Sequence, residues 1–322
     1  MPEWLVERGI GETRAALVDK GEIVEARIEL NGTLPSGSVI KARLVNPGVE
    51  GRNAIAVAEG GAEYMLPKGG CGVSQGATVT IEVTRETIPG TEPWKFPLAR
   101  VTTKPLQEMP PLGERLRARE LTFPAPRDEL ASVGWDDLID QARTGEIMFA
   151  GGALRIFATP AMTLIDVDGY LAPDELAILG AAEAALAIRR LDIGGSIGID
   201  LPTVGSKTAR QRAATAIDDV LPQPFERTAV NGFGFVQIVR PRSRASLIEL
   251  AQDPPSFEAR ALLRRATFDG AGARRLVAHP SIIAALERRE EWLNALAGQL
   301  GGPVSLRADA HLPMSGGYAE AA

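Results

Sequence analysis

Two apolar stretches that end in aspartate determine how this chain is expected to fold: Met162-Thr-Leu-Ile-Asp166-Val-Asp168-Gly169 and Gly194-Gly-Ser-Ile-Gly-Ile-Asp200-Leu-Pro202. Each has the length and composition of a buried strand that delivers a carboxylate at its C-terminal end. Residues 173–190 lie between them, are rich in Ala and Leu and predict a helix. The segment is therefore typical of a βαβ unit with two parallel strands.

Binding sites in such sheets form at the carboxyl edge. Two or three carboxylates that meet there, without Cys or His beside them, suit a hard divalent cation such as magnesium. The first hypothesis is therefore a metal-assisted hydrolase. The alternative from the residues alone is that Asp166 and Asp200 cap turns or a following helix.

Composition places the chain among ordinary globular proteins, with 322 residues, 45% hydrophobic and 24% charged, enough for two or three subdomains. No apolar run reaches the roughly 20 residues of a membrane span, and the start does not resemble a signal peptide. We therefore expect a cytoplasmic protein with no membrane partner. The single cysteine, Cys71, excludes an internal disulfide and a Cys-based zinc cluster within one chain. The net charge of -6 argues against indiscriminate polyanion binding but leaves room for local basic sites.

The chain divides into five expected segments. Residues 14–19 and 22–29 alternate in strand fashion and are joined at Lys20-Gly21, which predicts a hairpin. Five short strands punctuated by Gly and Pro predict a small barrel, and the prolines after Lys104 predict a linker with one short helix at 114–120. The expected boundaries are 1–32 for the first hairpin, 33–104 for the barrel, 105–144 for the linker and a helix at 136–142, 145–252 for the catalytic subdomain and 253–322 for a small α+β domain.

Further elements are expected in the last two segments. A hairpin should turn at Gly151-Gly152, ahead of the aspartate strands. The others are a helix at 208–220, a strand at 232–239, helices at 257–266 and 282–300, short strands at 275–278 and 304–307 and a frayed C-terminus.

Four ordered motifs carry a resemblance to a known family. They are Glu12-Thr-Arg-Ala-Ala-Leu-Val-Asp-Lys-Gly21; Gly151-Gly152 followed by Leu164-Ile-Asp166-Val-Asp168; Arg190-Leu-Asp192-Ile-Gly-Gly195 leading to Ile197-Gly-Ile-Asp200; and Phe233-Gly-Phe-Val-Gln237-Ile-Val-Arg240-Pro-Arg242. With these motifs the chain resembles the bacterial ribonuclease E/G family of single-strand endoribonucleases. Ordered matches across most of the chain are far more specific than any single motif.

The resemblance implies a multi-subdomain fold of the α+β and α/β type. It would combine a ribonuclease-H-like and deoxyribonuclease-I-like catalytic scaffold with an inserted OB-type barrel that binds RNA. The implied activity is magnesium-dependent cleavage of single-stranded RNA that leaves a 5′-phosphate, with manganese as the other usable ion. Asp166 and Asp200 are the implied metal ligands, and Asp168 is an aligning neighbour or a third ligand.

Several basic and aromatic residues are expected to contact RNA. Arg240 and Arg242 belong to a matched motif, whereas Lys207 and Arg210 follow Asp200 at the start of a helix and have a solvated helix face as their alternative. In the barrel, the expected contacts are Tyr64 and Lys95, together with Lys41, Arg43 and Lys68. The segment Gly205-Ser206-Lys207-Thr208 lacks the upstream glycine of a phosphate-binding loop, which leaves a nucleotide-dependent enzyme as a third hypothesis.

The chain also departs from the family pattern. Only the short segment 105–144 stands where the family has a domain that senses a 5′-monophosphate, so we expect no such sensing. No cysteine lies near residues 252–258, where the family's zinc link belongs, so we expect no zinc and no zinc-linked assembly, although another homo-oligomer stays open. Asp168 replaces a family Asn, and Gln237 replaces an acidic residue. The rival hypothesis is a non-catalytic RNA-binding or adaptor protein that retains the fold.

Overall fold

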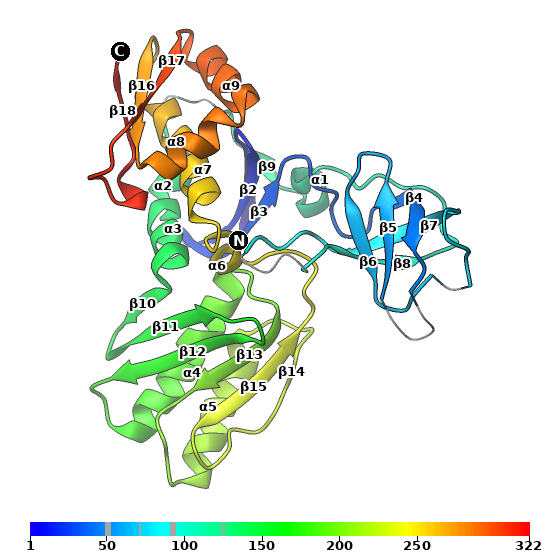
Figure 1. Cartoon of the computed structure of the whole chain (residues 1–322). Helices are drawn as coiled ribbons and strands as arrows, with labels where there is room; N and C mark the ends of the chain where they lie inside the picture. Colours follow the sequence, from blue (N-terminus) through cyan, green and yellow to red (C-terminus); the bar gives the residue numbers. More distant parts are fainter. Residues whose placement is uncertain (49–52, 71, 91–94, 124, 126) are drawn as a thin grey trace. The chain divides into compact units, whose positions relative to one another are not determined.

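The computed structural model describes residues 1–48, 53–70, 72–90, 95–123, 125 and 127–322, so Cys71 lies outside the described residues. The chain forms two compact units, each assembled from separate segments. The first comprises Met1–Asn31, Leu112–Asp137 and Leu250–Ala322; the second comprises Gly32–Pro111 and Leu138–Glu249. Several sheets, helices and a closed barrel give a mixed multidomain α+β fold, as expected at that level (Figure 1).

The barrel in the second unit is confirmed. Its strands close in the order β4-β5-β6-β8-β7 (Figure 1). Alternate side chains such as Leu44, Leu66 and Ile81 are fully buried inside it, which explains the period-two pattern in the sequence. The strands are β4 Val39–Asn46, β5 Ala54–Ala58, β6 Glu63–Leu66, β7 Thr78–Arg85 and β8 Leu98–Val101.

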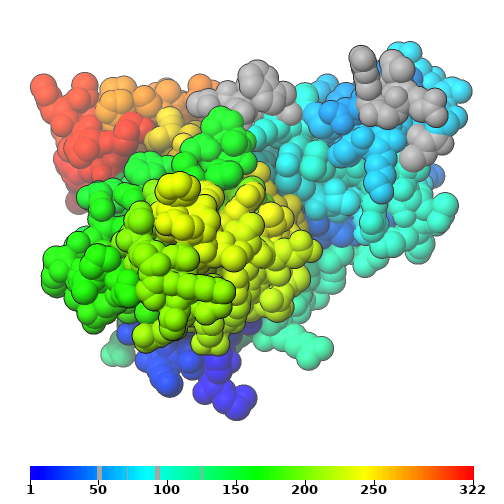
Figure 2. All heavy atoms as spheres, turned by 90° about the horizontal axis from the view of Figure 1, so that it is seen from below, coloured from blue at the N-terminus to red at the C-terminus, as the bar shows by residue number. Residues whose placement is uncertain are grey.

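The second unit also contains a six-stranded sheet in the order β10-β11-β12-β13-β15-β14. In the space-filling view, its green to yellow atoms form one continuous body (Figure 2). The elements are β10 Glu146–Phe149, β11 Gly152–Ala158, β12 Thr163–Gly169, α4 Pro173–Arg190, β13 Gly195–Asp200, α5 Lys207–Val220, β14 Glu226–Arg227 and β15 Phe235–Arg240.

The predicted βαβ unit is confirmed, because β12 and β13 pair in parallel and α4 connects them. Ile165 and Val167 of β12 are buried on the face against which α4 packs. Gly180 lets the helix approach closely, since a Cβ there would lie 2.3 Å from Val167 Cγ1. Acidic residues in the first turn of α4 and arginines in its last turn complement the helix dipole.

The first unit holds a four-stranded sheet in the order β3-β2-β1-β9. The predicted hairpin of β2 Glu12–Asp19 and β3 Glu22–Leu30 is confirmed, with Lys20 and Gly21 at positive φ in its turn. The sequence prediction missed β1 Glu3–Arg8, which pairs with β2. The helix expected at 114–120 is also wrong over its second half: α1 ends early and β9 follows, parallel to β1. The bounds are α1 Leu112–Leu116, β9 Arg119–Glu120 and α2 Glu129–Ser132. The helix α3 Trp135–Thr144 starts in the first unit and belongs to the second unit from Leu138.

The C-terminal part of the first unit adds a three-stranded sheet, β17-β16-β18. The helix expected at 282–300 is two helices, and the expected frayed terminus is wrong because β18 pairs antiparallel with β16. None of the described helices combines the length and apolar character that crossing a membrane requires. The elements are α7 Pro254–Phe268, β16 Arg274–Ala278, α8 Pro280–Glu287, α9 Glu290–Leu300, β17 Val304–Ala308, the 3-10 helix η1 Met314–Gly316 and β18 Tyr318–Ala321. The short helix α6 Leu247–Leu250 precedes them in the chain and belongs to the second unit up to Glu249.

Charged side chains form a buried network inside the first unit. Glu7 accepts hydrogen bonds from Arg14 Nη1 at 2.7 Å and from Arg264 Nε at 2.9 Å. Glu12 accepts from Arg14 Nε at 2.7 Å and from Arg260 Nε at 2.6 Å. These side chains are at most 5% exposed. The network thus joins the N-terminal strands to α7, and each charge depends on its partners because burial removes its hydration.

The network predicts acid sensitivity of the first unit. Burial raises the pKa of Glu12, but Arg14 and Arg260 together outweigh burial and hold that pKa below its ordinary value. A carboxylate with a lowered folded-state pKa contributes stability above its unfolded pKa of about 4.3 and loses it as the pH falls through the folded pKa. We expect the free energy of unfolding in urea to fall below about pH 4, and to fall less steeply in E12Q. Equal pH dependence in both proteins would contradict the role of Glu12.

Candidate active site

Asp166 and Asp200 lie side by side on the six-stranded sheet. They are register partners on the parallel strands β12 and β13, so their Cα atoms are about 4.8 Å apart. Both alternate with buried isoleucines, Ile165 and Ile199, and therefore project from the sheet face opposite α4. The pairing of β12 with β13 thus brings the two carboxylates together, as the sequence predicted.

Arg155 lies in one row with Asp166 and Asp200 across the neighbouring strands. It was not predicted from the sequence as a site residue. It lies on β11 directly opposite Asp166. Its Nη1 atom donates to Asp168 Oδ2 at 2.5 Å and is 3.8 Å from Asp166 Oδ2. The row therefore runs from a guanidinium on β11 to carboxylates on β12 and β13, and Asp168 pairs with the guanidinium.

The carboxylates influence one another. Burial raises the pKa of Asp166 most, the negative charges of Asp168 and Asp200 raise it further, and Arg155 opposes them without cancelling them, so the pKa lies above its ordinary value. Close like charges disfavour joint ionisation. The cluster therefore has an excess of negative charge that a bound cation would relieve.

Gly151 and Gly152, which precede β12 in the chain, are required for steric reasons. Gly151 has a φ of 102° in the turn that leads into β11. A Cβ on Gly152 would lie 2.3 Å from the carbonyl oxygen of Asp168, so only glycine permits the observed approach of β11 to β12. The pair thereby sets the strand spacing next to the carboxylates.

Two exposed aromatic side chains flank the same sheet edge and were not singled out from the sequence as base-contacting groups. Tyr170 follows β12 directly and is 86% exposed. Phe233 is 81% exposed in the turn before β15, and its carbonyl accepts a hydrogen bond from Thr203, three residues beyond Asp200. Exposed aromatic rings are the usual platforms for unpaired bases.

Lys207 and Arg210, the two residues after Asp200 that were expected to contact phosphate, differ in their surroundings. Lys207 is exposed at the start of α5, whose N-cap Ser206 accepts from the Ala209 amide. Arg210 donates through Nη1 to the carbonyls of Val204 at 2.8 Å and Gly205 at 3.1 Å. Arg210 therefore fixes the loop that follows β13, whereas Lys207 projects into solvent.

Arg240 and Arg242 lie at the other end of β13 from the carboxylates. Arg240 pairs with Gly195, five residues before Asp200, which corresponds to about 16 Å along the strand. Arg240 Nη1 donates to the carbonyl of Ile193 at 2.9 Å, and Arg242 forms an ion pair with Glu249. Their contact with RNA stays a prediction, but the register separates it from the Asp166–Asp200 pair.

In the barrel, the expectation for Tyr64 is wrong. Its ring is 4% exposed within the barrel core, and burial raises the pKa of its hydroxyl, so the ring is not available for stacking on a base. Lys95 is half-buried near the start of β8.

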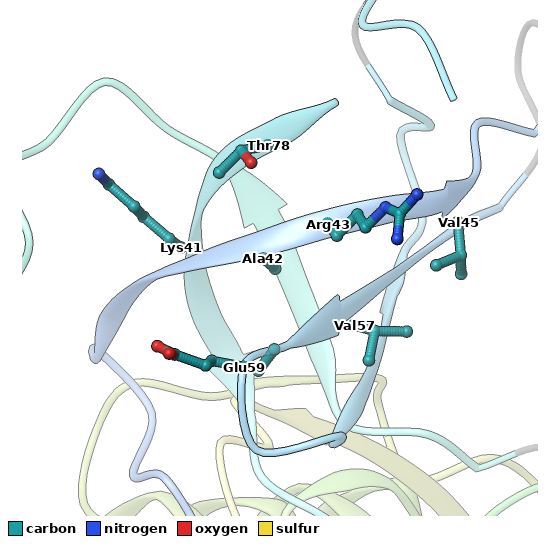
Figure 3. A pocket seen from close by; sticks show the side chains of 8 residues that line it. Lys41, Ala42, Arg43, Val45, Val57, Glu59 and Thr78 are labelled. Atoms are coloured by element: carbon teal, nitrogen blue, oxygen red, sulfur yellow. The ribbon is translucent and has the colours of Figure 1, made fainter. Parts of the chain in front are cut away.

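Lys41 and Arg43 do share one outer surface of the barrel. They project from β4 beside Val57 of β5 and Thr78 of β7 around a shallow pocket of about 410 Å³, with Glu59 at its border (Figure 3). Two cations above an aliphatic floor suit a nucleic-acid backbone better than an apolar ligand. Both residues were expected from the sequence to contact RNA.

The Asp166–Asp200 pair fits a magnesium ion. Mg²⁺ in proteins is held by one or two carboxylates, with water and substrate phosphate in the remaining positions. The described residues contain no group of three or more His, Cys, Asp or Glu side chains arranged to hold a metal ion. Of the three carboxylates in the row, Asp168 is engaged by Arg155.

Comparison with known proteins finds similarity to ribonucleases over part of the chain. Over 110 residues the chain is 32% identical to Ribonuclease G of Escherichia coli (strain K12), a match that covers 30% of this chain and 22% of that protein. Ribonuclease G of Shigella flexneri gives the same values, and that of Salmonella typhimurium (strain SL1344) is 31% identical with the same coverage. No model of a protein family matches the chain.

These similarities support a distant relationship to the ribonuclease E/G family. The matched part of the chain spans only 22% of the length of the curated relatives.

Proposed function

We propose that this protein is a magnesium-dependent endoribonuclease that cleaves single-stranded RNA and leaves a 5′-phosphate, without sensing the 5′ end. The observation that carries the proposal is the register pairing of Asp166 with Asp200 on one exposed sheet face. The distant similarity to Ribonuclease G supplies the substrate class.

In this proposal Asp166 and Asp200 hold the ion, which when bound would lower the pKa of a water ligand and neutralise charge on the phosphate. With an ion held there, the RNA backbone would lie over β12 and β13. Tyr170 and Phe233 stack the neighbouring bases, and Lys207 binds a flanking phosphate. Manganese would serve in the same place, and any homo-oligomer would form without zinc.

The competing proposal is an RNA-binding protein with the same fold and no cleavage. The observation in its favour is the engagement of Asp168 by Arg155, which leaves two carboxylates for a cation. An end-labelled unstructured RNA distinguishes the proposals: binding is measured in EDTA over a salt series, and cleavage is measured after magnesium addition. Binding that weakens with salt, without cleavage in magnesium or manganese, would favour the competing proposal.

The exposed aromatic residues give a separate prediction. We expect Y170A and F233A each to weaken single-stranded RNA binding by about 1–3 kcal/mol, because each removes one stacking surface. Y318A is the matched control, since Tyr318 is 41% exposed on β18 and has no place in the proposed site. Fluorescence anisotropy in EDTA measures all three, and equal affinities for Y170A, F233A and Y318A would exclude stacking at this edge.

A further inference from the structure

We infer that Arg155 binds a phosphate of the RNA next to the metal-binding pair, and that Asp168 acts by positioning Arg155 rather than as a metal ligand. The inference rests on the proposed function and adds a substrate-binding residue to it. Its basis is the row in which β11 presents Arg155 opposite Asp166, and β13 presents Asp200 on the other side of Asp166.

The guanidinium of Arg155 is held by a hydrogen bond, but not all of its N–H donors are used. Its Nη1 atom hydrogen-bonds to Asp168 at 2.5 Å, and its Nε atom is 4.0 Å from Glu146 Oε1 on β10. The Nη2 atom donates to none of the described residues. Because a guanidinium has five N–H donors in a planar fork, Arg155 keeps donors for an incoming phosphate while Asp168 fixes its orientation.

The position of Arg155 also suits a phosphate. The side chain is 46% exposed, and Nη1 is 3.8 Å from Asp166 Oδ2, so a phosphate held over Asp166 and Asp200 lies within reach of the fork. By contrast, Arg210 donates to loop carbonyls, Arg242 pairs with Glu249 and Arg244 pairs with Asp192 at 3.0 Å. Arg155 is therefore the arginine of this sheet that lies next to the carboxylates and still has N–H donors available.

The arrangement assigns different roles to Asp166 and Asp168, although they are two residues apart on one face. Asp166 pairs in register with Asp200 and shares a cation with it. Asp168 extends beyond the end of β13, since the register of β12 with β13 ends at Asp200. Its 63% exposed carboxylate is directed to the guanidinium instead.

RNA affinity in EDTA tests the first half of the inference. We expect R155A to bind an unstructured RNA roughly tenfold more weakly than wild type, because one charge-assisted hydrogen-bonding group is lost. The slope of log affinity against log salt should decrease by about 0.7, the value for one phosphate contact on a single strand. R155K should recover part of the affinity. R307A is the charge-matched control, as Arg307 on β17 is 48% exposed, and it should bind as wild type does.

Calorimetric Mn²⁺ titration without RNA tests the second half. Loss of Asp166 should abolish binding. D168N should weaken binding by less than about threefold, because it removes a nearby negative charge and not a ligand, and R155A should bind Mn²⁺ more tightly because a nearby positive charge is gone. In addition, D168N should lower the cleavage rate in the wild-type background and have little effect in R155A.

The outcomes separate the inference from the proposed function. Unchanged RNA affinity and salt slope in R155A would overturn the phosphate contact even if the wild type cleaves RNA. A large loss of Mn²⁺ affinity in D168N would overturn the positioning role. A wild type that binds RNA without cleaving it would refute the proposed catalysis alone, because the binding measurements still decide the role of Arg155. A wild type that does not bind RNA would refute both.

Discussion

Asp200→Asn is expected to lower the rate of RNA cleavage roughly 100- to 1,000-fold, since the loss of one of two metal-binding carboxylates removes several kcal/mol of transition-state stabilisation. Asp166→Asn should do the same, because the two residues are register partners that share the cation. Neither change should weaken RNA binding in EDTA, since each removes a negative charge from the surface that receives the phosphate. Single-turnover cleavage of an end-labelled RNA measures the rate.

Asp219→Asn is the matched control for this prediction. Asp219 is an exposed aspartate on α5, the helix that continues from the loop after Asp200. Its variant removes the same charge and should cleave at the wild-type rate. Because the Asp166 side chain is 43% exposed and Asp200 is exposed at a strand end, all three variants should unfold within about 0.5 kcal/mol of wild type, so a lower cleavage rate would not result from unfolding. Equal rates in D200N and D219N would contradict the assignment of the metal pair.

Glu7→Gln is expected to lower the free energy of unfolding by about 3–5 kcal/mol. The change removes one carboxylate that Arg14 and Arg264 contact, at 2.7 Å and 2.9 Å, and leaves two buried guanidinium groups with Glu12 and Asp128 as their respective remaining partners. Urea denaturation followed by far-UV circular dichroism measures the loss. Since all three side chains are at most 3% exposed, water cannot replace the missing partner.

Glu120→Gln is the control for the buried network. Glu120 pairs with Arg8 at 2.6 Å in the same unit, but its side chain is 54% exposed. An exposed pair contributes less than about 1 kcal/mol, so E120Q should unfold almost as wild type does. A similar loss in E7Q and E120Q would show that the buried network is not what stabilises this unit.

The aspartate strands could be predicted because each is an apolar run that ends in a carboxylate and is joined to the other by an apolar helix. The barrel strands could be predicted for a similar reason, since buried and exposed residues alternate between turn residues. The pattern does not show which residues of neighbouring strands contact each other. Arg155 and Asp168 are thirteen residues apart, and only the antiparallel register of β11 with β12 brings them into contact.

Tyr64 shows a second limit of the sequence. It was expected to contact RNA, but adjacent residues of a strand face opposite sides, and the residue type alone does not show which side faces the barrel core. Tyr64 shares its face with Leu66, so both side chains lie in the barrel core. The strand β18 was missed for another reason. Residues 318–321 lie at the chain end with no alternating pattern of their own, and their pairing comes from the edge that β16 offers.

The central claim is that the Asp166–Asp200 pair forms a metal-dependent phosphodiester centre. Its most direct test is cleavage of one unstructured RNA by wild type and by D166N, purified in parallel and titrated with magnesium. We predict wild-type cleavage that saturates with magnesium, stops in EDTA and yields downstream products with a 5′-phosphate, and no comparable cleavage by D166N. Cleavage of equal rate in both proteins, or cleavage that persists in EDTA, would contradict the account.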